Sequence, residues 1–176
     1  MDDAVTARWW RRNAIALAAV AVLLPTTAVV VGGNEWWNAN QADPVFPTTV
    51  GPDTTVEFGG ATWGPARWGT VAADTASDAP AGARAVVIEV PVDPRGKILS
   101  CGSPMLRETG GENRRWINAL ADVDWSYDAQ SSCPSDEAVP FTIEVPYLVP
   151  DDATGPFDLE LALTDQLPGY LVLRLP

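Results

Sequence analysis

The sequence predicts a mainly β protein: an antiparallel β-sandwich ectodomain behind one N-terminal transmembrane helix. Three observations lead to this fold class. Residues 14–31 are an apolar run without a charged side chain. From about Thr54 onward, short β-like runs are separated by turn residues. Several of these runs alternate apolar and polar side chains with period two, which is typical of strands with one buried and one solvated face.

Residues 1–13 are expected to form a short cytoplasmic segment. Arg8, Arg11 and Arg12 precede the apolar run, and the next basic residue is Arg67. Because basic residues beside a membrane helix favour the cytoplasmic side, the N-terminus is expected in the cytoplasm and the C-terminal part outside the membrane.

Residues 14–33 are expected to form the transmembrane helix. At about 1.5 Å per residue, the apolar run covers roughly 27 Å, close to the ~30 Å hydrocarbon core of a bilayer. Two tryptophan pairs lie about 39 Å apart on such a helix, so both fall at headgroup depth, where indole rings prefer to lie. Gly32 and Gly33 are expected to end the helix. The predicted membrane-interface residues are Arg8, Trp9, Trp10, Arg11, Arg12, Trp36 and Trp37.

A cleaved signal peptide is the competing interpretation of the same run. Residues 14–24 form a short apolar stretch after a basic start, Pro25 interrupts it, and residues 26–28 offer small side chains for cleavage. We favour an uncleaved signal anchor, because apolar residues continue through 29–31 and the second tryptophan pair lies where an anchor needs it. Cleavage near Ala28 would instead give a secreted protein. Both interpretations place the C-terminal part outside the cytoplasm.

Residues 34–53 are expected to form an extended linker. They contain Pro44, Pro47 and Pro52 among polar residues and show no sustained helical or strand periodicity. Residues 54–176 are then the extracytoplasmic β-sandwich domain.

The predicted strands of this domain are residues 54–58, 67–73, 84–92, 104–108, 114–119, 140–149, 156–163 and 170–175. Alternation of apolar and polar side chains is clearest in the last three. Pro91 and Pro146 fall inside two of the runs. Because proline cannot donate a hydrogen bond to a neighbouring strand, both predict an edge or a bulge.

Cys101 and Cys133 are the two cysteines of the chain, and an extracytoplasmic location predicts that they form a disulfide. Closing a loop of about 32 residues would stabilise the fold by roughly 3–4 kcal/mol on the chain-entropy model. The spacing is not that of a CxxC motif, which disfavours a redox-active pair.

Composition excludes several classes of site. The chain has no histidine, which excludes a Ser-His-Asp triad, a Cys-His pair and histidine-containing zinc sites. From Gly32 onward there are 8 basic and 21 acidic side chains, so nucleic acid is not an expected partner. No cofactor is expected. The acidity is explained first by solubility, and it mildly favours a basic partner.

Asp122, Asp124 and Asp128 are weak candidates for a metal site. Acidic side chains at alternating positions can bind calcium, but the glycine and glutamate of an EF-hand loop are missing, and a solvated loop is the more usual outcome. No spacing singles out a pair of carboxylates for a hydrolase. A dyad of Ser100 with Lys97 is conceivable, although serines are common in turns.

Four tryptophans fall in the predicted domain. Trp68 and Trp116 lie within strand-like runs and are expected in the core. Trp63 and Trp125 lie near loops, where burial and an exposed platform for a sugar or a protein are about equally expected.

Five segments carry a family resemblance. They are RWWRR before the anchor, RAVVIEVPV, CGSPMLRE ahead of a tryptophan-bearing strand, the second cysteine, and PYLVPDDATGPFDLEL. In these segments the chain resembles uncharacterised actinobacterial single-pass membrane proteins with a small extracytoplasmic immunoglobulin-like domain. The resemblance implies an immunoglobulin-like sandwich and an accessory or interaction role at the cell envelope. It implies no catalytic residues.

The function expected from the sequence is therefore not enzymatic. We expect a membrane-anchored extracytoplasmic domain that contacts membrane lipid through its helix and binds another envelope protein or a cell-wall component. Exposed strand edges and the loops around Cys101 and Cys133 are the expected contact regions. The alternatives are a calcium- or carbohydrate-binding module and a carboxylate-dependent envelope hydrolase.

Overall fold

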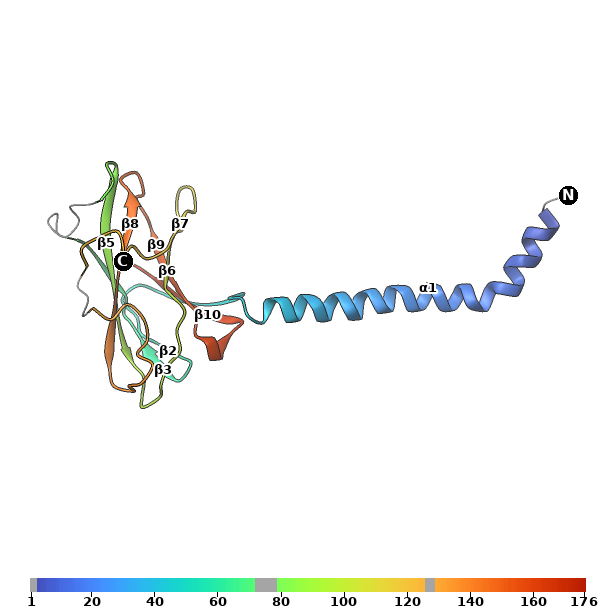
Figure 1. Ribbon diagram of the computed structural model, residues 1–176, viewed down its shortest axis with the longest axis horizontal. Coiled ribbons are helices and arrows are strands. Elements are labelled where there is room, and N and C mark those ends of the chain that lie inside the picture. Colours follow the sequence, from blue (N-terminus) through green and yellow to red (C-terminus); the bar gives the residue numbers. More distant parts are fainter. Residues whose placement is uncertain (1–2, 72–78, 126–128) are drawn as a thin grey trace. The chain divides into compact units, whose positions relative to one another are not determined.

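The structure is a computed structural model that describes residues 3–71, 79–125 and 129–176, without the side chains of residues 3–9, 11 and 40. The chain divides into two compact units, Met1–Ala42 and Asp43–Pro176. The first unit is helical and the second is the β domain (Figure 1).

The first unit is one helix, α1 (Asp3–Asn40), which is long and apolar enough between Arg12 and Ala39 to cross a membrane. A signal sequence meets the same criterion, so α1 is consistent with a signal anchor or a signal peptide. Pro25 lies inside the helix, where it removes one backbone donor. Thr26 donates its hydroxyl to the carbonyl oxygen of Val22 at 2.7 Å, which ties the two turns together across the proline.

The expected end of the helix at Gly32 and Gly33 is wrong, because α1 continues to Asn40. Glycine in a helix costs about 1 kcal/mol relative to alanine, but it does not oblige the helix to stop. Trp36 and Trp37 therefore lie on the helix itself and not beyond its end.

Sheet A, the first of two five-stranded sheets, is mixed. Its strand order is β1 (Phe46–Val50), β10 (Gly169–Arg174), β9 (Phe157–Leu161), β6 (Met105–Glu108) and β7 (Arg115–Trp116). β1 runs parallel to β10, and the other neighbours are antiparallel.

Sheet B, the second sheet, is antiparallel and is built around the long strand β5 (Ala83–Asp93). One side of β5 pairs with β8 (Phe141–Pro150) over ten residues. The other side pairs with β3 (Ala61–Trp63) and β4 (Arg67–Thr70), and β2 (Val56–Phe58) pairs with β3. The short helix η1 (Thr164–Gln166) leads into β10.

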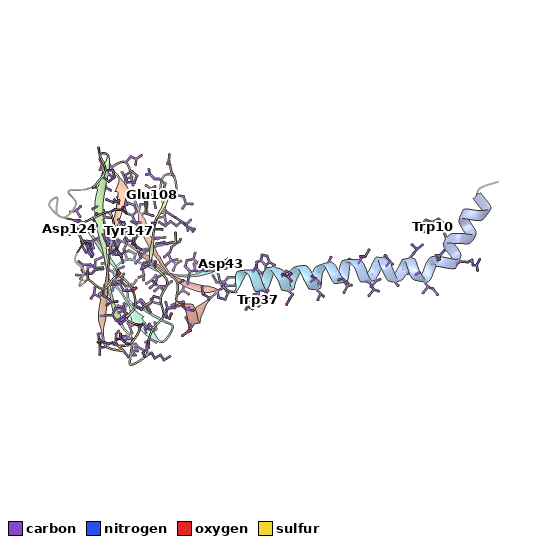
Figure 2. All side chains as sticks on the ribbon, viewed as in Figure 1. Trp10, Trp37, Asp43, Glu108, Asp124 and Tyr147 are labelled. Atoms are coloured by element: carbon purple, nitrogen blue, oxygen red, sulfur yellow. A yellow bond between two sulfur atoms is a disulfide. The ribbon has the colours of Figure 1, made fainter. Side chains whose placement is uncertain are left out.

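The core lies between the two sheets, whose layers are visible side by side in Figure 1. The period-two alternation correctly identified the inward side chains of β8, β9 and β10, among them Ile143, Leu159 and Leu173. Tyr147 is also fully buried (Figure 2), and its hydroxyl donates to the carbonyl oxygen of Pro104 at 3.0 Å. Burial raises the pKa of this phenol, so Tyr147 stays neutral and acts as a donor inside the core.

The expected linker over residues 34–53 is not found in the structure. Its first part belongs to α1, and Phe46–Val50 form strand β1 of sheet A. The alternation rule misses β1 because four of its five side chains are exposed at the sheet edge. β3 is the other strand that was not predicted. Each of the eight predicted runs contains a strand, although only Arg115–Trp116 of the run 114–119 is paired.

Pro91 and Pro146 occupy positions that need no donor. Pro91 lies opposite the break between β3 and β4, where its carbonyl oxygen accepts the N–H of Gly64 at 2.9 Å. Pro146 lies on the outer edge of β8, where its carbonyl oxygen accepts the N–H of Ala119 at 2.8 Å. The prediction of an edge or a bulge is thus confirmed for Pro146, because β8 pairs with β5 alone among the described strands. It is wrong for Pro91, which lies in the central strand β5 and is tolerated because no residue of β3 or β4 is paired with it.

The disulfide between Cys101 and Cys133 is present, as predicted, with Cα atoms 5.5 Å apart. Cys101 also forms an isolated bridge with Leu163, just beyond β9. The disulfide therefore ties the segment that leads from β7 to β8 onto the body of the domain.

Candidate functional site

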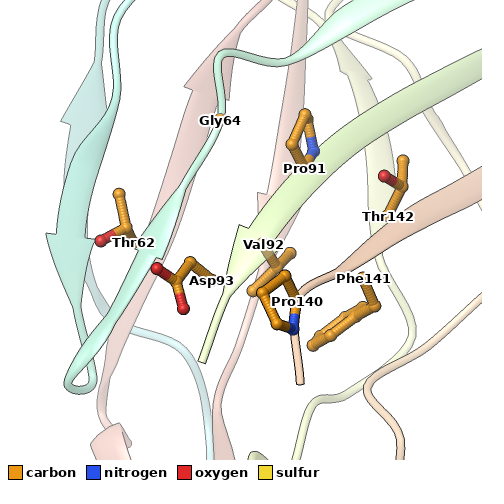
Figure 3. A pocket seen from close by; sticks show the side chains of 8 residues that line it. All are labelled: Thr62, Gly64, Pro91, Val92, Asp93, Pro140, Phe141 and Thr142. Atoms are coloured by element: carbon orange, nitrogen blue, oxygen red, sulfur yellow. The ribbon is translucent and has the colours of Figure 1, made fainter. Parts of the chain in front are cut away.

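A hollow of about 340 Å³ lies on the outer face of sheet B, where β3, β5 and β8 meet (Figure 3). Its lining includes Thr62, Gly64, Pro91, Asp93, Phe141 and Thr142. These residues come from stretches of chain that are distant in sequence and are brought together by the pairing of the three strands.

The hollow exists because the side chains at its floor are small. Gly64 has no side chain, and its φ of +81° is a conformation that favours glycine. The break after β3 leaves space over Pro91, and Thr62 and Thr142 on either side are short. A bulkier residue at any of these positions would fill the depression.

The lining combines an apolar surface with acceptor groups. Figure 3 shows Thr62 and Asp93 close together on one side, with Pro140 and Phe141 at the lower end and Thr142 beyond Pro91. Asp93 is exposed, and its carboxylate accepts the backbone N–H of Arg95 at 2.9 Å. This bond fixes the direction of the carboxylate while leaving capacity for a second donor.

A second hollow of about 470 Å³ adjoins the first, since both are lined by Pro140 and Phe141. It is formed by the segment around Cys133 and includes Asp136 and Glu137, both exposed. No lysine or arginine is among the residues that line either hollow. We call the two together the acidic groove.

Further carboxylates stand next to the acidic groove on the same face of sheet B. Glu89 and Glu144 are directly opposite each other on β5 and β8, two residues from Pro91 and Thr142. Neither forms an ion pair with any residue that the structure describes. Like charges directly opposite on neighbouring strands destabilise a sheet, so this arrangement is retained at a cost in stability.

The outer face of sheet A has the opposite character. Arg115, Arg107, Asp158 and Arg174 form one row across β7, β6, β9 and β10. Glu160 accepts from both Arg107 and Arg115, at 3.2 Å and 3.3 Å. We call the three arginines and two carboxylates the arginine face.

Asp158 is the unusual member of the arginine face. It is only 8% exposed and makes no hydrogen bond with any described residue. Burial raises its pKa, against the attraction of Arg174 and Arg107, which lowers it.

One strong ion pair lies at the end of the sandwich. Glu108 is 2% exposed, and its carboxylate accepts from Arg114 Nε at 2.9 Å and from Nη2 at 3.3 Å (Figure 2 labels Glu108). Arg114 also donates to Asp152 at 2.9 Å and lies over the ring of Trp116. These partners raise the pKa of the guanidinium, and Arg114 keeps the buried carboxylate paired.

The structure places the predicted interface residues on α1. Trp10, Trp36 and Trp37 are each about half exposed there, and Arg12 is exposed. The side chains of Arg8, Trp9 and Arg11 lie outside the described residues. Their position at a membrane surface stays a prediction.

The weak metal candidates are not brought together with other ligands. Asp122 and Asp124 are exposed, and Asp124 lies at the periphery of the domain in Figure 2. Asp128 lies outside the described residues. Across residues 3–71, 79–125 and 129–176 no group of three His, Cys, Asp or Glu side chains could hold a metal ion.

The conceivable dyad of Ser100 with Lys97 is not formed. The hydroxyl of Ser100 is 3.1 Å from that of Thr164, and the ammonium of Lys97 lies over Gly60. Both residues line a small hollow of about 140 Å³, but no hydrogen bond joins them.

The tryptophans divide differently from the prediction. Trp63 is fully buried, and its indole N–H donates to the carbonyl oxygen of Phe58 at 2.9 Å. Trp68, expected in the core, is 39% exposed at the rim. There its edge contacts Phe157, and its N–H donates to Pro176. Trp116 is half-buried against the core, and Trp125 is half-buried as well.

Sequence reasoning missed the acidic groove. Asp93 stands at the end of a predicted strand and Phe141 near the start of another, and nothing in the spacing joins them. The available signals were Gly64-Pro65 beside a strand and proline at three of the later lining positions (Pro91, Pro134 and Pro140), which indicate irregular backbone.

Comparison of the chain with protein-family models, with curated proteins and with solved structures finds no match. The family resemblance expected from the sequence is thus not supported by these comparisons. The molecule is described by its parts: one N-terminal apolar helix and a two-sheet β domain with one disulfide.

Proposed function

We propose that this protein is a membrane-anchored, non-enzymatic interaction protein whose extracytoplasmic domain binds a basic segment of another envelope protein. The observation that carries the proposal is the acidic groove. Asp93, Asp136 and Glu137 line it without a lysine or arginine, beside the apolar surface of Pro140 and Phe141. A cell-wall component with exposed amino groups would be recognised by the same chemistry.

The proposed location is the cell membrane, with the N-terminus in the cytoplasm and a single pass through the bilayer. The length and apolar character of α1 support it, as do the arginines that precede the apolar run. The disulfide supports an extracytoplasmic domain, because such bonds persist in oxidising compartments. Secretion after cleavage near Ala28 is the alternative.

For the β domain we propose an immunoglobulin-like relationship. In that sandwich, strands B and E pair in one sheet, while C, F and G are neighbours in the other. β5 and β8 pair in sheet B, and β6, β9 and β10 are consecutive neighbours in sheet A, in matching chain order. These pairings support the assignment, and the actinobacterial resemblance remains part of the proposal.

Recognition would combine charge with an apolar contact. A lysine or arginine of the partner can pair with Asp93 or Asp136 while its stem packs on Pro140. The attraction of such exposed carboxylates mainly raises the rate of association, and salt screens it. Tethering to a membrane raises the local concentration of both partners.

The test uses the full chain in detergent micelles and a fluorescent peptide of alternating lysine and alanine. We expect binding at low salt, and an at least tenfold weaker affinity for the variant D93N/D136N/E137Q. The matched control E112Q/D122N/D165N removes the same number of exposed carboxylates elsewhere and should bind like the wild type. Equal losses in the two variants would mean that net charge, and not the groove, is recognised.

A carbohydrate is the second candidate ligand, and the hydroxyls of Thr62 and Thr142 on either side of the first hollow, with the carboxylate of Asp93, favour it. Sugars exchange hydrogen bonds with hydroxyls and carboxylates. Bound glycan should raise the melting temperature of the domain. If no glycan of a wall-derived panel shifts the melting temperature while the basic peptide binds, the carbohydrate is excluded and the protein ligand stands.

A further inference from the structure

The two outer faces of the sandwich carry opposite surpluses of charge. The arginine face presents Arg107, Arg115 and Arg174 against Asp158 and Glu160. The face of sheet B presents Glu89, Asp93 and Glu144, and Arg67 is the cation paired across from Glu89. The domain as a whole is strongly acidic, so a face with more arginines than carboxylates differs in sign from the rest of its surface.

Some of the N–H donors on the arginine face have no hydrogen-bond partner among the described residues. Arg174 is exposed and makes no hydrogen bond or ion pair with any described residue. Asp158, directly opposite it on β9, is nine-tenths buried and likewise has no hydrogen-bond partner there. Arg174 attracts Asp158 without a hydrogen bond to it, so the N–H donors of Arg174 remain available to an outside carboxylate, as do some of those of Arg115, whose side chain is 51% exposed.

We infer that the basic partner of the acidic groove is a second copy of this chain, which docks its arginine face onto the groove. This inference rests on the proposed function and names its partner. The contact joins two different surfaces, so it is heterologous: each copy keeps one free face of each kind, and a row of copies can grow.

The size of the faces sets the strength of the contact. The five strands of sheet A hold 22 residues (5, 6, 5, 4 and 2), and at about 3.3 Å by 4.8 Å per residue they give a face of roughly 350 Å². Two such faces bury about 700 Å², below the roughly 1,000 Å² of stable specific interfaces. The contact is then weak in solution and becomes significant when anchored copies share a membrane.

The test is a complementation of charge variants, measured by analytical ultracentrifugation of the full chain in detergent micelles. One variant, R115E/R174E, makes the arginine face acidic, and the other, D93R/D136R/E137R, makes the lining of the groove basic. Wild type should associate at 50 mM salt and dissociate at 500 mM. Each variant alone should associate at least tenfold more weakly than the wild type.

The mixture of the two variants gives the decisive result. The acidic groove of the first and the arginine face of the second remain intact, and the two reversed surfaces also carry opposite charges, so a 1:1 mixture should associate again, as dimers or longer rows. Unfolded variants could not restore association, so restored association also reports on folding. Melting curves of each variant serve as the control for folding.

Three results would overturn the inference: a monomeric wild type at low salt, variants that associate like the wild type, or a mixture that does not associate. If the wild type is monomeric while the basic peptide still binds, the partner is another protein and the proposed function stands. If the peptide fails to bind as well, both proposals fail.

Discussion

Replacing Trp63 by alanine removes the largest fully buried side chain of the domain. Trp63 is 0% exposed, and its indole N–H donates to the carbonyl oxygen of Phe58 at 2.9 Å. Truncation of a buried tryptophan costs about 3–5 kcal/mol, through lost burial and the cavity that remains. For a domain of about 130 residues, each kcal/mol shifts Tm by roughly 3–4 °C, so the expected fall is about 10–18 °C.

The same change at Trp68 is the matched control. Its side chain is 39% exposed and contacts Phe157 by its edge, so W68A should cost about 1–2 kcal/mol, or roughly 3–7 °C. W63F keeps most of the ring and loses the hydrogen bond, and should fall between the two. It also keeps the comparison measurable if W63A does not fold.

Thermal unfolding of the full chain in micelles, followed by circular dichroism at a β-sheet wavelength, measures these shifts. A fall for W68A equal to or larger than that for W63F would refute the reasoning. It would mean that the exposed tryptophan, and not the buried one, holds the two sheets together.

Three further predictions concern Asp158, the disulfide and the N-terminus. Burial raises the pKa of Asp158 in the folded state, so the folded protein binds its proton more tightly than the unfolded chain, and stability falls as pH rises through this range. D158N should therefore raise Tm at pH 7 and change it little at pH 4, and a Tm difference independent of pH would contradict this sign. Reduction of the disulfide should lower stability by about 3–4 kcal/mol, seen in urea titrations with and without reductant, and an unchanged midpoint would contradict the chain-entropy estimate. Sequencing of the mature protein from native membranes should find the uncleaved N-terminus, whereas a start after Ala28 would refute the anchor.

The sheet architecture could be predicted where one face of a strand is buried and the other is wet. β8, β9 and β10 carry that alternation, and their inward residues are in the core. β1 could not be found this way, because it is held at the sheet edge by pairing with β10 and has one buried side chain. Edge pairing depends on a partner far along the chain, which local sequence pattern does not report.

The disulfide could be predicted because cysteine chemistry and compartment leave few alternatives for two cysteines. How deeply each tryptophan is buried could not be predicted from the sequence. Trp63 is buried by its pairing with Val56 and Val92 on two neighbouring strands, and Trp68 reaches the rim because β4 lies at the edge of sheet B. These are properties of strand order.

The candidate site was the part of the structure that the sequence predicted least well. Its lining residues come from β3, β5, β8 and the segment around Cys133, and the register between strands sets their spacing. A net acidity was visible in the composition, and it predicted the sign of a partner's charge without locating the surface.

The parallel pairing of β1 with β10 has a consequence for the order in which the domain can fold. Phe46 pairs with Gly169, so the first strand to leave the ribosome must wait for the last one. At 5–20 residues per second, the intervening stretch takes roughly 6–25 s to synthesise. Throughout that interval the chain emerges with an unpaired strand directly after its apolar helix. In the growing chain, sheet A therefore gains its β1 edge only after β10 has been made, whereas the pairings of sheet B do not depend on β10.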